Sequence, residues 1–276
     1  MWSVTRRPDL LATCLLLYLL LPFGILFADE SEVEDESEFT YTRHSEKGPE
    51  NWANINPHWK ACGSRKLQSP IDLVNERVEV SPMLGGLKRT YKPAPAVIKN
   101  RGHDITVTWQ GDAGGVVINR TEYQLLQCHW HTPSEHTVDE KRFKMEIHLV
   151  HKNLAGQISV VGILYKLGRP DPFLAKILQL LENIKTCGHK GTNIGVVDPW
   201  DIKFGSRKYF RYVGSLTVPP CTEGVLWTIL KKVRTVSQEQ MRALRDAVHD
   251  GFEDNARPIQ RNSGTMPVYM YRPGGD

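Results

Sequence analysis

The chain has 276 residues, of which 40% are hydrophobic and 24% are charged, and its formal net charge is +4. This composition is ordinary for a globular protein that buries one sizeable core, so one large domain is expected. The basic residues from Phe39 onward stand singly or in pairs, without a Lys/Arg-rich tract. They indicate a solvated basic surface and give no sign of a nucleic-acid partner.

An apolar run over residues 9–28 follows two arginines near the N-terminus. This layout predicts a secretory signal peptide over residues 1–28, with the mature chain starting near Asp29. The run is also long enough for an uncleaved membrane anchor. Pro22 and Gly24 near its end favour cleavage, so no stable membrane association is expected.

The next ten residues, Asp29 to Glu38, carry seven acidic residues and one apolar residue. Such a segment buries too little apolar surface to offset the entropy of ordering it, so it is predicted to be a disordered acidic leader. No linker or repeat divides residues 39–276, which are predicted to form a single catalytic domain.

Four cysteines remain after removal of the signal: Cys62, Cys128, Cys187 and Cys221. An oxidising secretory route makes a structural disulfide plausible, but the spacing does not reveal the pairing. The one glycosylation sequon begins at Asn119 and follows a turn-like glycine-rich stretch. Both features fit secretion.

Strand patterns rich in β-branched and aromatic residues predominate in the domain. They cover Ile105–Trp109, Gly115–Ile118, Tyr123–His131, Phe143–His151, Ile158–Leu167 and Val225–Leu230. Two helices are expected. One covers Pro172–Ile184, with proline at its start, and the other follows Ser237, which forms a capping box with Gln240, and ends at Gly251. The fold class is therefore mainly β (α+β).

Gln127, His129 and His131 are spaced two residues apart, which on a strand puts all three side chains on one face. The residues after His131 read as a connection, so Phe143–His151 is expected to return antiparallel. Its Glu146 and His148 also share a face.

If the two faces coincide, three neutral histidines converge and leave one coordination position open, as in catalytic zinc sites. Gln127 and Glu146 are placed to accept the free N–H groups of the ligands. The plainer interpretation is that these histidines are ordinary half-buried strand residues, and spacing alone does not identify a reaction.

Several further motifs occur in a fixed order along the chain. They are GPENW at 48–52, QSPIDL at 68–73, QCHWHTPSEHTVDEKRFKMEIHLVH at 127–151, GSLTVPPCTEGVLWTI at 214–229 and NARPIQ at 255–260. From about Tyr41 to about Tyr269 the chain resembles the alpha carbonic anhydrases, and closely their secreted plant branch. The resemblance implies one domain on a large, twisted, mostly antiparallel sheet with short peripheral helices, and an active-site cone leading to zinc.

The resemblance also implies a reaction, the reversible hydration of carbon dioxide to bicarbonate and a proton by hydroxide generated on zinc. His129, His131 and His148 match the zinc ligands, and Gln127 and Glu146 match the residues that support them. The small molecules carbon dioxide and bicarbonate are the expected partners.

Further matched positions imply roles around the metal. Glu135 matches a gatekeeper carboxylate, and Thr217 matches the threonine that donates a hydrogen bond to it. His103 matches the proton shuttle, and Tyr41 matches a tyrosine that orders water, although extra residues before GPENW leave that alignment open. The apolar wall for carbon dioxide would consist of Val150, Val160, Leu216, Val225 and Trp227.

Val218 stands where many relatives have a second threonine, so binding of bicarbonate or inhibitors is expected to differ. Cys62 and Cys221 match the disulfide of secreted members. Some plant relatives are tuber storage or nectar proteins, so a non-catalytic storage or binding role, or an ascorbate-linked redox role, is the alternative function. The expected destination is the extracellular space, the apoplast, with a plastid reached through the secretory route as the alternative.

Overall fold

A computed structural model of the chain describes residues 32, 38–64, 66–181, 191–249, 251–261 and 266–273. All of them belong to the compact unit Ser31–Asp276. The predicted signal peptide, most of the predicted leader and Cys187 lie outside the described residues.

The described strands form two sheets, a large one and a small three-stranded one in the order β1-β8-β9. The strands are β1 Asp72–Leu73, β2 Glu79–Val80, β3 Lys88–Arg89, β4 Ala94–Asn100, β5 Ile105–Trp109, β6 Gly115–Ile118, β7 Thr121–His131, β8 Thr137–Val138, β9 Lys141–Arg142, β10 Met145–Lys152, β11 Ile158–Leu167, β12 Thr192–Val197, β13 Tyr209–Ser215, β14 Glu223–Leu230, β15 Arg234–Val236 and β16 Tyr269–Tyr271.

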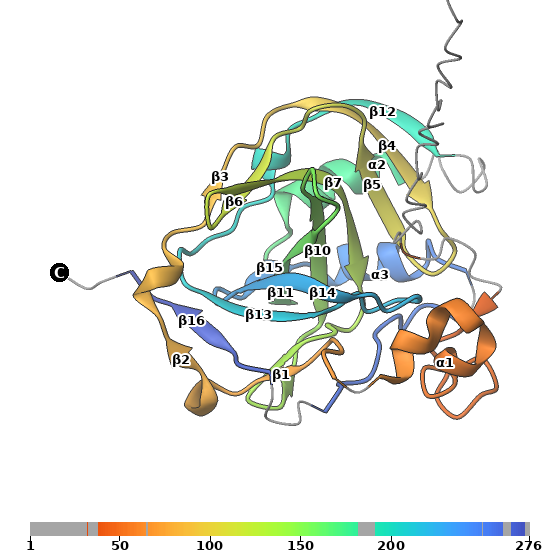
Figure 1. Cartoon of the computed structure of the whole chain (residues 1–276). Helices are drawn as coiled ribbons and strands as arrows, with labels where there is room; N and C mark the ends of the chain where they lie inside the picture. The colour runs from red at the N-terminus through yellow and green to blue at the C-terminus, as the bar shows by residue number, and fades with distance from the viewer. Residues whose placement is uncertain are drawn as a thin grey trace, which may run out of the picture. The chain divides into compact units, whose positions relative to one another are not determined.

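The large sheet runs β12-β4-β5-β7-β10-β11-β14-β13-β16-β2, and it twists strongly from one end to the other (Figure 1). Most neighbours are antiparallel, whereas β11 pairs in parallel with β14 and β15, and β16 with β2. The predicted fold class, a mainly β protein on a large, mostly antiparallel sheet, is confirmed.

The helices are short and lie outside the sheet (Figure 1). The α-helices are α1 Trp52–Ile55, α2 Pro172–Leu181 and α3 Gln238–Arg245, and the 3-10 helices are η2 Pro57–Gly63, η3 Asn75–Arg77, η4 Pro82–Leu84 and η5 Pro199–Asp201. The capping box of Ser237 and Gln240 starts α3 as predicted. The helix ends at Arg245, earlier than the expected stop at Gly251, which instead adopts a φ of 93° in the following turn.

Strand β4 was not among the predicted strands; it contains Pro95, and proline removes a ladder hydrogen bond. In the structure β4 lies between β12 and β5, and the register with β12 shifts between Asn193 and Val196, beside Pro95. Strand β4 therefore forms although Pro95 has no N–H group to donate.

The central pair β7 and β10 positions the site. Their antiparallel register sets His148 opposite His129, and Glu146 opposite His131. Because directly opposed residues share a face, the two histidine motifs meet on one side of the sheet, as the spacing predicted. The other side of these strands buries Cys128, Trp130 and Ile147 in the largest hydrophobic cluster of the described residues.

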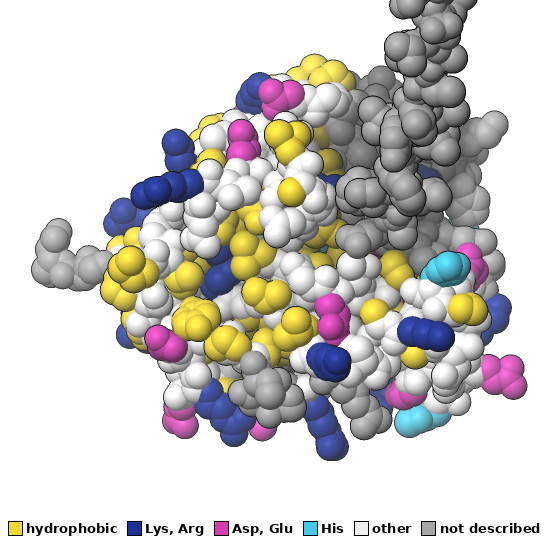
Figure 2. All heavy atoms as spheres, in the orientation of Figure 1, with side chains coloured by type: hydrophobic (Ala, Val, Ile, Leu, Met, Phe, Trp, Pro, Cys, Tyr) yellow, Lys and Arg dark blue, Asp and Glu magenta, His cyan; other side chains and the backbone are white. Residues whose placement is uncertain are grey.

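Charged side chains are dispersed on the face in Figure 2, where Lys and Arg residues alternate with Asp and Glu residues. This dispersion agrees with the expectation of a solvated surface without a basic tract. Among the described residues, no helix has the length and apolar character needed to cross a membrane.

Candidate metal centre

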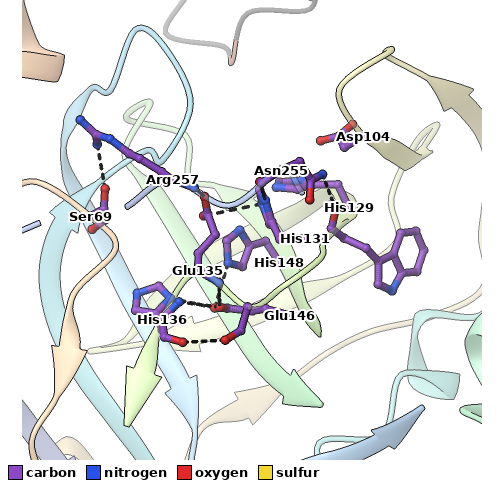
Figure 3. A network of polar contacts seen from close by, with 12 residues as sticks. Ser69, Asp104, His129, His131, Glu135, His136, Glu146, His148, Asn255 and Arg257 are labelled. Atoms are coloured by element: carbon purple, nitrogen blue, oxygen red, sulfur yellow. Dashed lines mark hydrogen bonds and ion pairs between the residues drawn. The ribbon is translucent and has the colours of Figure 1, made fainter. Parts of the chain in front are cut away.

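Three histidine side chains converge on one face of the central sheet: His129 and His131 from β7 and His148 from β10 (Figure 3). Each is at most 1% exposed, and one nitrogen from each lies within 4.8 Å of the other two. The ring centroids of His131 and His148 are 4.5 Å apart. Side chains of this kind, at this spacing, are able to bind one metal ion.

A hydrogen bond to a neighbour fixes the orientation of each imidazole. The Nδ1–H of His129 donates to Gln127 Oε1 at 2.9 Å, which leaves Nε2 facing the cluster. The Nε2–H of His148 donates to Glu146 Oε1 at 2.9 Å, which leaves Nδ1 for a metal. The two expected supporting residues, Gln127 and Glu146, therefore make the expected contacts.

Asn255 supplies the third of these contacts through its backbone oxygen, which accepts from the Nδ1–H of His131 at 2.8 Å. Its side chain also bonds to the backbone at Thr132, Trp130 and His103. One buried residue thus ties the segment that carries His131 to the segment that carries His103. The sequence analysis quoted the motif that contains Asn255 but assigned it no role.

Burial favours the neutral, metal-binding form of two of the three imidazoles, those of His129 and His148. Burial lowers the pKa of His129 well below its usual value and also lowers the pKa of His148. Burial alone would lower the pKa of His131, but the Glu135 carboxylate raises it. The Nε2 atoms of His129 and His131 are buried without a hydrogen-bond partner among the described residues. Such orphaned acceptors are what a bound metal ion satisfies.

A second group of potential ligands, His136, Glu146 and His148, is already connected by hydrogen bonds. The Nδ1–H of His136 donates to Glu146 Oε1 at 2.8 Å, and the other ring nitrogen of His136 lies 2.6 Å from the Tyr212 hydroxyl. The backbone N–H groups of Glu135 and His136 donate to the other carboxylate oxygen of Glu146. These bonds make the group a support for His148 rather than a separate metal site.

Glu135, which the resemblance matches to a gatekeeper carboxylate, is fully buried beside the histidines. Its Oε1 accepts from the backbone N–H of Arg257 at 2.9 Å, and its Oε2 lies 3.7 Å from His131 Nε2. The guanidinium of Arg257 is itself buried and donates to the carbonyls of Ser69 and Cys62. Sequence reasoning missed Arg257, although it belongs to the quoted NARPIQ motif.

Thr217 is 2% exposed and lies between β13 and β14. The expected hydrogen bond from Thr217 to Glu135 is not formed, since Glu135 Oε2 has no partner among the described residues. The roles of both residues remain predictions.

The residues expected to form the apolar wall do cluster. Val150, Val160, Leu216, Val225 and Trp227 belong to one buried hydrophobic cluster. The indole ring of Trp227 lies 4.9 Å from the ring of His148, which places this cluster against the metal ligands. Val218 does not belong to this hydrophobic cluster.

Val218 packs with Tyr41, Cys62 and Cys221 in a third buried cluster. Cys62 and Cys221 form a disulfide in the structure, as the resemblance implied. The hydroxyl of Tyr41 is buried without a partner among the described residues, and burial raises its pKa well above the usual value. Tyr41 therefore does not present its hydroxyl to solvent.

His103 is fully buried, whereas a proton shuttle must exchange its proton with solvent. Its ring packs against Phe39, with centroids 5.2 Å apart, and burial lowers its pKa to about 4. Both ring nitrogens lack hydrogen-bond partners among the described residues, and Nε2 lies 3.7 Å from Asp104 Oδ2. A proton shuttle at neutral pH needs a pKa close to 7, and the buried ring does not have one.

Arg101, Asp104 and Glu32 were not anticipated at the site. Arg101 Nε donates to Asp104 Oδ1 at 2.8 Å, and Arg101 Nη1 donates to Glu32 Oε2 at 2.9 Å. The other carboxylate oxygen of Glu32 lies 3.9 Å from His129 Nε2, the atom that faces the cluster. No spacing pattern links these residues, so the sequence held no signal for the contact.

Comparison with known proteins places this geometry in a family. The profile of the eukaryotic-type carbonic anhydrases matches residues 47–268. "Alpha carbonic anhydrase 4" of Arabidopsis thaliana is 54% identical over 256 residues, which cover 93% of this chain and 94% of that protein. "Dioscorin DB3L" of Dioscorea polystachya is 43% identical over 247 residues, with coverage of 89% and 91%.

Solved structures with the same fold point to the same family. A dioscorin crystallised with ascorbate superposes with a TM-score of 0.81 at 42% identity, covering 84% of this chain and 97% of that one. The alpha carbonic anhydrase of Thermovibrio ammonificans, in complex with the inhibitor sulfanilamide, superposes with a TM-score of 0.74 at 32% identity, with coverage of 84% and 98%. The sequence, the fold and the histidine cluster agree, and the chain belongs to the alpha carbonic anhydrase family.

Proposed function

We propose that the chain catalyses the reversible hydration of carbon dioxide to bicarbonate at a zinc ion held by His129, His131 and His148. The observation that carries this proposal is the cluster of three buried imidazoles, with one nitrogen of each within 4.8 Å of the others. Family membership supports the choice of substrate, because relatives along nearly the whole chain are carbonic anhydrases.

The donor set fits zinc, since three neutral histidines with an open position form a common catalytic zinc site. Zinc in such a site lowers the pKa of bound water and supplies hydroxide near neutral pH, as is established for carbonic anhydrases themselves. This chain holds the ligands through Gln127 and Asn255, and it orients His148 through Glu146.

The remaining groups act on the substrate and the nucleophile. The wall that contains Val160 and Trp227 provides a dry surface on which carbon dioxide rests. The carboxylate of Glu135 is held at a fixed position by the backbone of Arg257, and its free Oε2 is available to accept a hydrogen bond from the hydroxyl of Thr217. When the Thr217 hydroxyl donates its hydrogen bond to Glu135, its oxygen is left to accept a hydrogen bond from the nucleophile. This contact would orient the lone pair of the nucleophile.

The direct test is stopped-flow carbon dioxide hydration by the purified chain, with zinc content measured on the same sample. We expect about one zinc per chain, loss of activity on chelation and recovery on adding zinc. Full activity in zinc-free protein, or no activity in protein with one zinc per chain, would contradict the proposal.

A second candidate is a storage, binding or ascorbate-linked redox role on the same fold. It is favoured by the likeness to the dioscorin whose structure contains ascorbate. The complete histidine cluster and the buried Glu135 favour the enzyme. Zinc-loaded protein that consumes or regenerates ascorbate without hydrating carbon dioxide would select the second candidate.

We propose that the chain enters the secretory pathway and is glycosylated at Asn119. Asn119 and Arg120 both have positive φ values at the turn between β6 and β7, so the acceptor amide lies at the tip of a hairpin. Expression in a eukaryotic secretory host is expected to give a product whose mass falls on endoglycosidase treatment. Asn119→Gln should remove this difference, and an unmodified wild-type product in the medium would contradict the prediction.

His103 remains our proposed proton shuttle, acting from a second rotamer that reaches solvent. Two buried ring nitrogens without hydrogen-bond partners cost free energy, and a rotamer in which both bond to water would recover it. We expect His103→Phe, which keeps an aromatic ring against Phe39, to lower the maximal hydration rate in dilute buffer on the order of 10²-fold. Added imidazole should restore the rate.

The zinc content of this variant and its rate of attack on carbon dioxide, read from isotope exchange at equilibrium, should stay close to wild type. A loss of equal size at all buffer concentrations, without rescue by imidazole, would assign His103 a purely structural role.

A further inference from the structure

Arg211 is a buried cation on the side of the large sheet that faces away from the metal ligands. It lies on β13 between Phe210 and Tyr212, whose side chains belong to the same hydrophobic cluster as Trp227. Because side chains alternate along a strand, Arg211 points to the opposite face, together with Tyr209. Arg211 is only 5% exposed. Any ligand of this arginine is therefore separate from the metal centre.

The guanidinium of Arg211 lacks the partners that a buried cation needs. Its Nε has no hydrogen-bond partner among the described residues. Burial lowers the pKa of Arg211, and the ionisable groups that act against this effect are the phenols of Tyr209 and Tyr123. No carboxylate of the described residues is among them. Buried charges are normally paired, because the desolvation of a lone ion is costly, so one negative charge is missing at this position.

An aromatic contact holds the guanidinium in place without neutralising it. The Cζ of Arg211 lies 5.0 Å from the centroid of the Tyr209 ring, which is a cation–π contact. The hydroxyl of Tyr209 donates to the carbonyl of Gly85 at 2.8 Å, so the ring itself is fixed. A cation that is positioned before a ligand arrives lowers the entropy cost of binding that ligand.

A second unused donor lies directly opposite Arg211. The antiparallel register of β13 and β14 pairs Arg211 with Thr228, and opposed residues place their Cβ atoms about 5 Å apart on one face of a sheet. The Thr228 hydroxyl is fully buried and has no hydrogen-bond partner among the described residues. A guanidinium beside a hydroxyl group offers donors to both oxygens of one carboxylate.

The side chains next to this pair of donors are apolar. Val213 follows Arg211 by two residues on the same face and is 43% exposed, and the residue opposite Val213 is the half-buried Leu226. Figure 2 shows hydrophobic side chains gathered between β3 and β16. A strongly hydrated inorganic anion gains little from such neighbours, whereas an apolar body attached to a carboxylate buries its own surface against them. The chemistry therefore favours an organic carboxylate.

We propose that Arg211 and Thr228 form a second ligand site, which binds a small carboxylic acid with an apolar body on the face of the sheet opposite the metal centre. The guanidinium and the hydroxyl donate to the carboxylate, and Val213 and Leu226 contact the apolar body. The bound ligand supplies the counterion that the described residues do not provide. This site does not depend on the proposed function.

The test uses 4-fluorobenzoate as the probe, and its binding to the zinc-loaded full chain is measured by fluorine NMR titration. Arg211→Met keeps a long side chain but removes its charge, so we expect the dissociation constant to rise about 30-fold. Thr228→Val removes one neutral hydrogen bond and should raise it about fivefold. Arg207→Met replaces an exposed arginine just before β13, and this matched control should bind the probe as wild type does.

A carboxylate also binds metal ions, so the titration is repeated on His148→Ala, which removes a metal ligand from the other face. We expect His148→Ala to keep the wild-type affinity for the probe. The probe should also raise the Tm of wild type and leave the Tm of Arg211→Met unchanged. Equal binding by wild type and Arg211→Met would overturn the proposal, as would equal losses in Arg211→Met and Arg207→Met. Because hydration is not measured, failure of the proposed function leaves this result unaffected.

Discussion

Replacing His148 with Ala is expected to reduce carbon dioxide hydration to the uncatalysed background and to lower zinc content far below one per chain. His148 is buried among the other two histidines, and its Nε2–H is held by Glu146, which leaves Nδ1 as the atom for the metal. Two remaining histidines bind zinc weakly and leave no fixed direction for the nucleophile. Stopped-flow rates and metal analysis on one preparation measure both effects.

His151→Ala is the matched control, because it removes a second buried imidazole from the same strand. His151 contacts the Tyr91 hydroxyl and the Ser159 carbonyl rather than the metal ligands. This control should lose some stability but keep its zinc and its activity per zinc. A His148→Ala protein that retained one zinc and full activity would remove His148 from the site.

The central site could be predicted because it depends on local periodicity. Residues two apart on a strand share a face, and an antiparallel return brings a second strand alongside, so His129 and His148 meet without reference to the rest of the chain. The pattern needs only the sequence between Gln127 and His151. The structure has the same register.

Other parts of the site depend on contacts across long separations, which no local pattern encodes. Asn255 supports His131 from 124 residues away, and Glu32 reaches Arg101 across 69 residues. The burial of His103 depends on packing with Phe39 and Phe252, so its low pKa was not visible in the motif that surrounds it. Spacing identified the metal ligands, whereas tertiary packing determines what surrounds them.

The double variant Cys62→Ser/Cys221→Ser is expected to lower the free energy of unfolding by about 3–5 kcal/mol. The disulfide joins residues separated by 159 positions, and in the chain-entropy model a loop of this length gives a value near the top of that range. Urea denaturation of wild type, the double variant and Cys128→Ala provides the measurement. Cys128 is a buried free thiol, so its replacement removes a sulfur without opening a loop.

The same variant should also lose activity, because the disulfide connects to the site on both sides. The carbonyl of Cys62 accepts from Arg257, whose backbone N–H holds Glu135, and the N–H of Cys221 donates to the carbonyl of Val218, next to Thr217. Opening the bond frees the segment that carries Thr217 and loosens the anchor of Glu135. We therefore expect kcat to fall under conditions where the variant is still folded, while zinc content stays near one per chain. If the double variant unfolded at the same urea midpoint as wild type and kept the same kcat, the disulfide would contribute to neither the fold nor the site.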